Sequence, residues 1–146
     1  RLRTVDSIVV IGDCSDDDHF YLRRYNENII VTKIVATHLV NIVTGETTLI
    51  DSMIGVDFIA VAGIGNPKKF IKTLKANNLM RFKELIFKDH HKFVEDDFSS
   101  IDNYQHVIMT YKDAVKCRGL ANENWWYLDI DLDFDISLLN KGISSI

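Results

Sequence analysis

The stretch of sequence that decides the fold reads Phe58-Ile59-Ala60-Val61-Ala62-Gly63-Ile64-Gly65-Asn66-Pro67. Its first five residues are a continuous apolar run, which is typical of a strand buried on both faces of a parallel sheet. Two glycines then allow a tight turn, and Asn66 followed by Pro67 is a typical N-cap and first position of a helix. A buried strand, a glycine turn and a capped helix in succession predict an α/β unit.

The residues that follow continue this alternation of strands and helices. A helix is expected over 67–77, where three apolar residues form one stripe among lysines: Phe70, Ile71 and Leu74. Strands are expected at 85–87, 107–109 and 125–128, with a helix between the last two that begins at Thr110 in a capping-box pattern. We therefore predict a Rossmann-like three-layer α/β domain with a mostly parallel sheet.

The first third of the chain has a different pattern. Residues 7–12 predict a buried strand that begins almost at once, after an Arg at position 1, so we expect the chain to be cut from a longer parent. Residues 29–42 and 47–50 are rich in Ile, Val and Thr and flank a Thr-Gly-Glu turn. This pattern predicts a β-hairpin with a long first strand, which precedes the α/β domain as a linker.

The composition excludes several classes of protein. With 146 residues, 47% hydrophobic and 26% charged, the chain has ordinary globular values and no apolar run long enough to cross a bilayer. Its two cysteines, Cys14 and Cys117, are far apart, which argues against a zinc or redox motif and fits a reducing cytosol.

Charge is unevenly distributed along the chain. Residues 68–92 hold eight Lys and Arg against two acids, which is +6 within a chain of net charge −4. Such a basic block can mark a surface for phosphates or anionic lipid, and it can equally be a solvated helix face.

Polar residues follow three of the predicted strands. In a parallel sheet, the segments Gly63–Asn66, Asp89–His91 and Thr110–Asp113 would all emerge at the carboxyl edge, where ligands bind. Gly63 and Gly65 begin a dinucleotide fingerprint, but Lys68 stands at its third glycine position. The helix that begins after Asn66 could bind an anion at its N-terminus. Alternatively, the glycine turn before it could have a purely structural role. Lys112 and Lys116, one helical turn apart, could meet a phosphate or pair with surface acids.

The triplet Asp89-His90-His91 is the most specific feature of this edge. Histidine titrates near neutral pH and a carboxylate can orient its ring, so the triplet favours proton transfer, with a structural role as the alternative. A metal site is disfavoured, because adjacent residues of an extended segment point to opposite sides and no third histidine has a suitable spacing. The alternating acids of 129–135 superficially resemble a calcium-binding loop, but Phe134 stands where such a loop needs glycine. We interpret them as a strand with one solvent-exposed face.

Four stretches together resemble a known family. They are Val61 to Phe70, Asp89 to His91, Met109 to Arg118 and Trp125 to Leu128, and in this order and spacing they resemble the C-terminal half of tetraacyldisaccharide 4′-kinase, the lipid A 4′-kinase of Gram-negative bacteria. Residues 1–6 are similar to the family's segment before the last strand of its nucleotide domain. The resemblance covers nearly the whole chain.

The resemblance implies an enzyme that transfers the γ-phosphate of ATP, with Mg²⁺, to the 4′-hydroxyl of a tetraacyldisaccharide 1-phosphate in lipid A biosynthesis. Residues 1–25 would end the P-loop nucleotide domain, 26–56 would be the hairpin linker and 57–146 the C-terminal α/β domain. The chain has no Gly-x-x-x-x-Gly-Lys-Ser/Thr, so ATP and Mg²⁺ are expected to bind mainly to the other half, and this part alone is expected to be inactive.

The implied partners are the lipid disaccharide, the P-loop domain and the anionic surface of the bacterial inner membrane, on its cytoplasmic face, with no nucleic acid.

In the family, the histidine matched by His90 works with an aspartate of the other domain to accept the proton of the attacking hydroxyl, and Asp89 would support it. Candidate substrate or phosphate contacts at the edge are Gly63, Gly65, Asn66, Lys112 and His91; no metal ligand is predicted in this chain. Tyr111 departs from the family, which usually has an acid there. The alternative is a non-catalytic Rossmann-like interaction or regulatory module.

Overall fold

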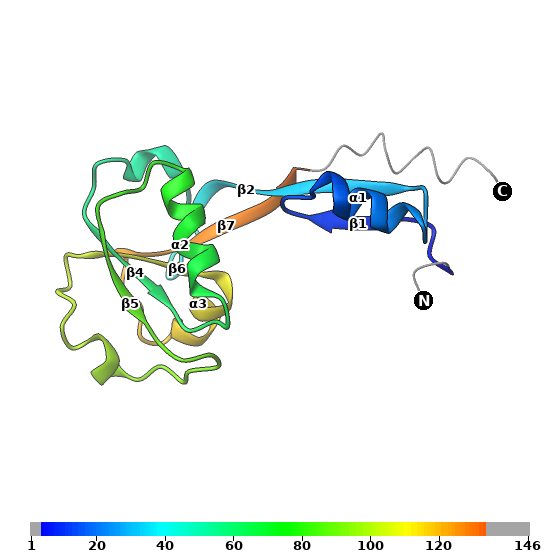
Figure 1. Cartoon of the computed structure of the whole chain (residues 1–146). Helices are drawn as coiled ribbons and strands as arrows, with labels where there is room; N and C mark the ends of the chain where they lie inside the picture. The colour runs from blue at the N-terminus through cyan, green and yellow to red at the C-terminus, as the bar shows by residue number, and fades with distance from the viewer. Residues whose placement is uncertain (1–3, 134–146) are drawn as a thin grey trace. The chain divides into compact units, whose positions relative to one another are not determined.

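The computed structural model describes residues 4–133, so Arg1 to Arg3 and the acid at 135 lie outside the described residues. The described residues form two compact units, one made of residues 4–35 with 131–133 and one of residues 36–130. Figure 1 shows the elements of both units. The predicted functional boundaries at 25 and 56 stay a prediction.

The smaller unit contains a parallel strand pair and a helix. Strand β1 (Ile8–Ile11) pairs with the beginning of β2 (Ile29–Asn41), with Ile8 opposite Ile29. Helix α1 (Asp16–Arg23) connects them and begins at Ser15, whose side chain and that of Asp18 form a capping box. None of the side chains of α1 is buried within the described residues.

The larger unit is built on a sheet with the strand order β2-β7-β6-β4-β5. Strand β4 pairs in parallel with β5 and β6, and β6 pairs in parallel with β7, whereas β3 pairs antiparallel with β2. The bounds are β3 Thr47–Leu49, β4 Phe58–Ala62, β5 Phe82–Ile86, β6 His106–Thr110 and β7 Trp125–Asp133. The predicted mostly parallel sheet and the hairpin with a long first strand are confirmed.

Side chains of β4 alternate between two apolar layers. Phe58, Ala60 and Ala62 pack with Phe70, Ile71 and Leu74 of helix α2 (Pro67–Ala76). Ile59 and Val61 pack on the opposite side with Ala114 and Cys117 of helix α3 (Tyr111–Cys117). All five residues of β4 are buried, as a strand covered on both faces requires. The predicted three-layer arrangement is confirmed, with α2 and α3 on the two sides of the sheet (Figure 1).

Helix α2 begins and ends through two recognisable caps. At its start the Asn66 side chain accepts a hydrogen bond from Lys69 N at 3.2 Å, and Pro67 occupies the first turn. At its end Asn78 adopts a left-handed backbone with φ of 60°. Asn78 N donates to Lys75 O, and Leu79 N donates to Leu74 O, which makes a Schellman motif.

Two elements differ from the expectation. Strand β5 runs over 82–86 rather than 85–87, because it is the edge strand and tolerates exposed Lys83 and Glu84 that an apolar pattern would exclude. The capping box at α3 is only half formed. Thr110 Oγ1 accepts from Asp113 N at 3.3 Å, but the Asp113 carboxylate turns into the protein. The short 3-10 helices η2 (Ile50–Met53) and η3 (Glu95–Phe98) were not predicted.

Candidate functional site

Strand β4 pairs in parallel with both β5 and β6, so the carboxyl ends of these three strands lie at one edge of the sheet. A methyl group on Gly65 would lie 3.1 Å from Asp89 Oδ2, and one on Gly63 would lie 3.5 Å from His91 Cβ. Gly63 N donates to Asp113 Oδ2 at 3.0 Å. The three segments predicted to converge therefore lie next to one another.

His90 is the exposed member of this edge. Its side chain is 91% exposed, and its backbone has a φ of 59°, which is uncommon for a residue other than glycine. The Asp89 carboxylate holds this turn: Oδ1 accepts from His90 N at 3.0 Å, while Oδ2 lies 3.7 Å from His90 Nε2. A left-handed histidine beside a carboxylate is the kind of backbone outlier that is frequent at functional sites.

His91 points the other way and is held from several sides. Its Nε2 lies 2.8 Å from Asp97 Oδ2, and its ring stacks on Phe87 with centroids 4.5 Å apart. Phe93 meets the same ring edge-on at 5.1 Å. The hydrogen bond from His91 and then the one from Val94 N hold the pKa of Asp97 below its ordinary value. These contacts anchor the loop that carries His90; a phosphate contact by His91 stays a prediction.

Asp113 links two of the three segments. Its side chain is fully buried and accepts from Gly63 N, from Thr110 Oγ1 at 2.8 Å and from Lys116 Nζ at 3.1 Å. A buried carboxylate with three donors is well compensated, and it fixes the glycine turn to the start of α3. Lys116 thus pairs with an acid of its own helix, whereas Lys112 is exposed.

The sequence alone did not single out Asp113 or Asp97. The sequence places Thr110–Asp113 at the carboxyl edge and predicts a capping box there, but it does not predict that the Asp113 carboxylate is buried against Gly63. Asp97 lies six residues beyond His91, in a segment without strand or helix periodicity that would place it against the ring.

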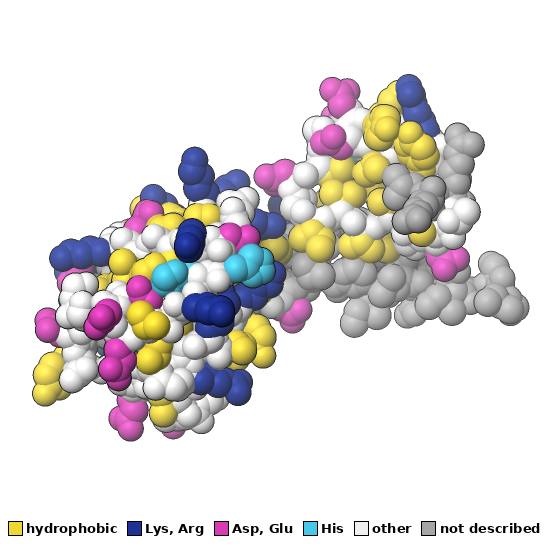
Figure 2. Space-filling model, turned by 90° about the horizontal axis from the view of Figure 1, so that it is seen from below, with side chains coloured by type: hydrophobic (Ala, Val, Ile, Leu, Met, Phe, Trp, Pro, Cys, Tyr) yellow, Lys and Arg dark blue, Asp and Glu magenta, His cyan; other side chains and the backbone are white. Residues whose placement is uncertain are grey.

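Half of the basic block, four of its eight residues, lies on α2, whose N-terminus is at the same edge. Lys68, Lys69, Lys72 and Lys75 are exposed, while the apolar stripe of the helix faces the core. Figure 2 shows histidine side chains with basic side chains near them on one face of the larger unit, which also carries acidic side chains. Within residues 4–133, no helix is both long and apolar enough to cross a membrane.

The fold and the edge together define an α/β domain that presents an exposed histidine and a supporting carboxylate beside a basic helix. A model of the family described as tetraacyldisaccharide-1-P 4′-kinase, LpxK, matches residues 1–145. The chain belongs to this family.

Curated relatives agree with the family assignment. The chain is 48% identical over 136 residues to a tetraacyldisaccharide 4′-kinase of Francisella tularensis subsp. novicida and 50% identical over 134 residues to one of Francisella philomiragia. These matches cover 93% and 92% of the chain but 42% of each relative. The chain thus spans about two fifths of the length of the relatives that it matches.

A solved structure shares the fold. It is the "apo" form of LpxK from Aquifex aeolicus in complex with ATP, with a TM-score of 0.60 and 20% identity. The match covers 94% of this chain and 51% of that one.

The described side chains give no support for a metal site of their own. Among residues 4–133, no group of three or more His, Cys, Asp and Glu side chains is placed to hold a metal ion. What this edge presents is an exposed imidazole, a carboxylate oxygen 3.7 Å from its Nε2 and nearby positive charge.

Proposed function

We propose that the chain is the C-terminal part of a kinase that phosphorylates the 4′-hydroxyl of a tetraacyldisaccharide 1-phosphate, with ATP and Mg²⁺ held mainly by a P-loop domain outside these residues. Family membership supports the reaction class. The observation that supports a role for this chain is the exposed, left-handed His90 beside Asp89 at the carboxyl edge of the sheet.

In this proposal His90 is a catalytic residue that accepts the proton of the attacking 4′-hydroxyl. Phosphoryl transfer depends largely on positioning and charge neutralisation, and a base orients the nucleophile. The proton moves from the hydroxyl oxygen to a ring nitrogen of His90, and the Asp89 carboxylate, 3.7 Å from Nε2, stabilises the imidazolium that forms.

Hydrogen bonds of neighbouring residues hold the loop that carries His90. His91 is bonded to Asp97 within this loop, and Asp113 of α3 accepts a hydrogen bond from Gly63 of the adjacent glycine turn. Gly63, Gly65, Asn66 and Lys112 would line the substrate side of the same edge, where the N-terminus of α2 favours negative charge.

The reaction is tested with the full-length protein and two acceptors. Transfer of labelled phosphate from ATP to tetraacyldisaccharide 1-phosphate is expected, and none is expected to the analogue that lacks the 4′-hydroxyl. Equal labelling of both acceptors, or of neither, contradicts the proposal.

We further propose that the exposed lysines of α2 bring the protein to the anionic cytoplasmic face of the inner membrane. Each basic residue near an anionic surface contributes about 1 kcal/mol of attraction. Replacing Lys68, Lys69 and Lys72 by Gln in the full-length protein should reduce its sedimentation with vesicles that contain phosphatidylglycerol, and leave the small binding to phosphatidylcholine unchanged. Unchanged binding to the anionic vesicles refutes this part.

A further inference from the structure

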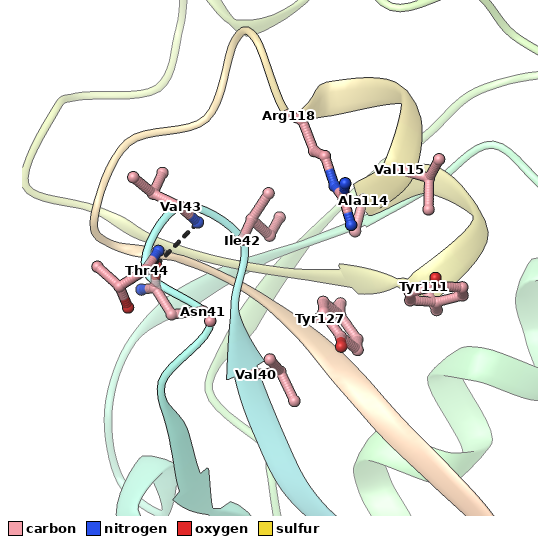
Figure 3. A pocket seen from close by; sticks show the side chains of 11 residues that line it. Val40, Asn41, Ile42, Val43, Thr44, Tyr111, Ala114, Val115, Arg118 and Tyr127 are labelled. Atoms are coloured by element: carbon pink, nitrogen blue, oxygen red, sulfur yellow. Dashed lines mark hydrogen bonds between the residues drawn. The ribbon is translucent and has the colours of Figure 1, made fainter.

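A hollow of about 430 Å³ lies in the larger unit, away from the Asp89–His91 loop. Its walls are the turn after β2, residues of α3 and Tyr127 of β7 (Figure 3). A volume of this size falls within the usual range of about 300–1,000 Å³ for small-molecule sites. No residue of the Asp89–His91 loop lines it.

The turn that forms one wall is held firmly. The buried Asn41 side chain accepts from Val43 N and Thr44 N, each at 3.0 Å, and donates to Glu123 O at 2.7 Å. Ile42 N also donates to Trp125 O at 2.9 Å. The wall is therefore formed before any ligand arrives, which reduces the entropic cost of binding.

Arg118 supplies an uncompensated positive charge. Its side chain reaches from the end of α3 into the space beside the turn (Figure 3). It takes part in none of the ion pairs or hydrogen bonds found among residues 4–133. A guanidinium with its donors unused suits a phosphate, because it can form two parallel charge-assisted hydrogen bonds.

Two tyrosines and several aliphatic side chains complete the hollow. The rings of Tyr111 and Tyr127 meet edge-on with centroids 5.1 Å apart, and Val40 and Val115 lie beside them. The pKa of Tyr127 is raised, mainly by burial and then by Asp129 and Tyr111. Its protonated hydroxyl can donate a hydrogen bond to an oxyanion. The hollow thus offers donors for an anion and apolar surface for the group that carries it.

We infer that this hollow is a second binding site, in which Arg118 and Tyr127 bind the phosphate of a monoester or lipid headgroup whose apolar part lies against Val115 and Tyr111. None of the residues of the Asp89–His91 loop lines this site, although Tyr111 belongs to the Thr110–Asp113 segment of the carboxyl edge.

The test uses the full-length protein and phenyl phosphate, which joins an oxyanion to an apolar ring, in ligand-observed NMR titrations. Arg118→Gln should weaken binding at least about tenfold, because it removes the charged partner. Tyr127→Phe should weaken it about two- to tenfold through loss of one hydrogen bond. Lys83→Gln, the same charge change on exposed β5, should leave it unchanged. Near-ultraviolet circular dichroism and Tm verify that each variant is folded.

Two further arms identify the source of the phosphate and separate this site from the catalytic edge. Loss of binding to phosphatidylglycerol vesicles in Arg118→Gln assigns the phosphate to a membrane headgroup, and loss of phenyl phosphate binding alone assigns it to a smaller ester. His90→Ala should keep wild-type binding of phenyl phosphate whatever its effect on phosphate transfer. Equal binding by Arg118→Gln and Lys83→Gln, or no binding by the wild type, overturns the inference.

Discussion

At the scale of single residues, Asp113 is a buried carboxylate that holds three hydrogen-bond donors. It is fully buried and accepts hydrogen bonds from Gly63, Thr110 and Lys116. Asp113→Ala should lower the free energy of unfolding by about 2–4 kcal/mol, because it leaves a buried amide and a lysine without their partner. Denaturant unfolding measures this change. Asp96→Ala, at an exposed position of η3, is the matched control, and equal stability of the two variants would count against the structural role of Asp113.

The pair of His91 and Asp97 predicts a pH dependence of stability. Since the folded pKa of Asp97 is lower than its ordinary value of 3.8, its contribution is fully present above that pH and is lost as the pH falls through the folded pKa. The difference in unfolding free energy between the wild type and Asp97→Asn should therefore be constant at neutral pH and shrink below about pH 3.8. A difference that stays the same across this acidic range would refute the assignment.

At the scale of elements, the end of α2 offers a test of backbone geometry. Asn78 has a φ of 60° at the position where glycine is favoured, and its side chain is exposed. Asn78→Gly should raise the unfolding free energy by about 0.5–1 kcal/mol, whereas Asn78→Ala should lower it by about 1 kcal/mol. Thermal unfolding of the two variants measures the order. The reverse order would show that the Schellman motif does not form.

How far the sequence predicts the elements depends on how much of the information is local. The apolar run of β4 and the Asn66–Pro67 helix start carry their signals within a few residues, and both are found where expected. The bounds of strand β5 were predicted wrongly, because an edge strand tolerates exposed polar residues and its edge position is defined only in the assembled sheet.

At the candidate site, topology predicted which segments meet, because parallel strands bring their carboxyl ends to one edge. Which side chain faces which partner depends on loop geometry. His91 turns toward Asp97, and Asp113 turns toward Gly63 instead of completing a capping box. The hollow beside Arg118 joins residues from three separated segments and has no signal in any one of them.

At the scale of the whole molecule, the two units differ in how much apolar surface they bury. Strand β4 is buried throughout, whereas Val9 and Ile11 of β1 are 45% and 50% exposed. In hydrogen exchange of the 146-residue chain, amides of β4 should be the slowest and those of β1 distinctly faster, since local opening is easier where fewer apolar contacts are lost. Equal protection of the two strands would contradict this picture.

The family assignment concerns a chain that spans 42% of its curated relatives, so the edge at Asp89–His91 is interpreted as one side of a larger catalytic site. This interpretation differs from that of a non-catalytic module in one respect. A catalytic His90 affects the rate of transfer, whereas a structural one affects only folding.

The most direct measurement is therefore the kcat of phosphate transfer to tetraacyldisaccharide 1-phosphate by full-length His90→Ala. Loss of a general base should lower kcat about 10²–10⁴-fold. Because the His90 side chain is 91% exposed, His90→Ala should lose no more than about 1 kcal/mol of stability, the cost of alanine at a φ of 59°. His38→Ala, at a histidine on β2, should retain wild-type turnover. A His90→Ala enzyme that is folded and transfers phosphate at the wild-type rate would contradict the account.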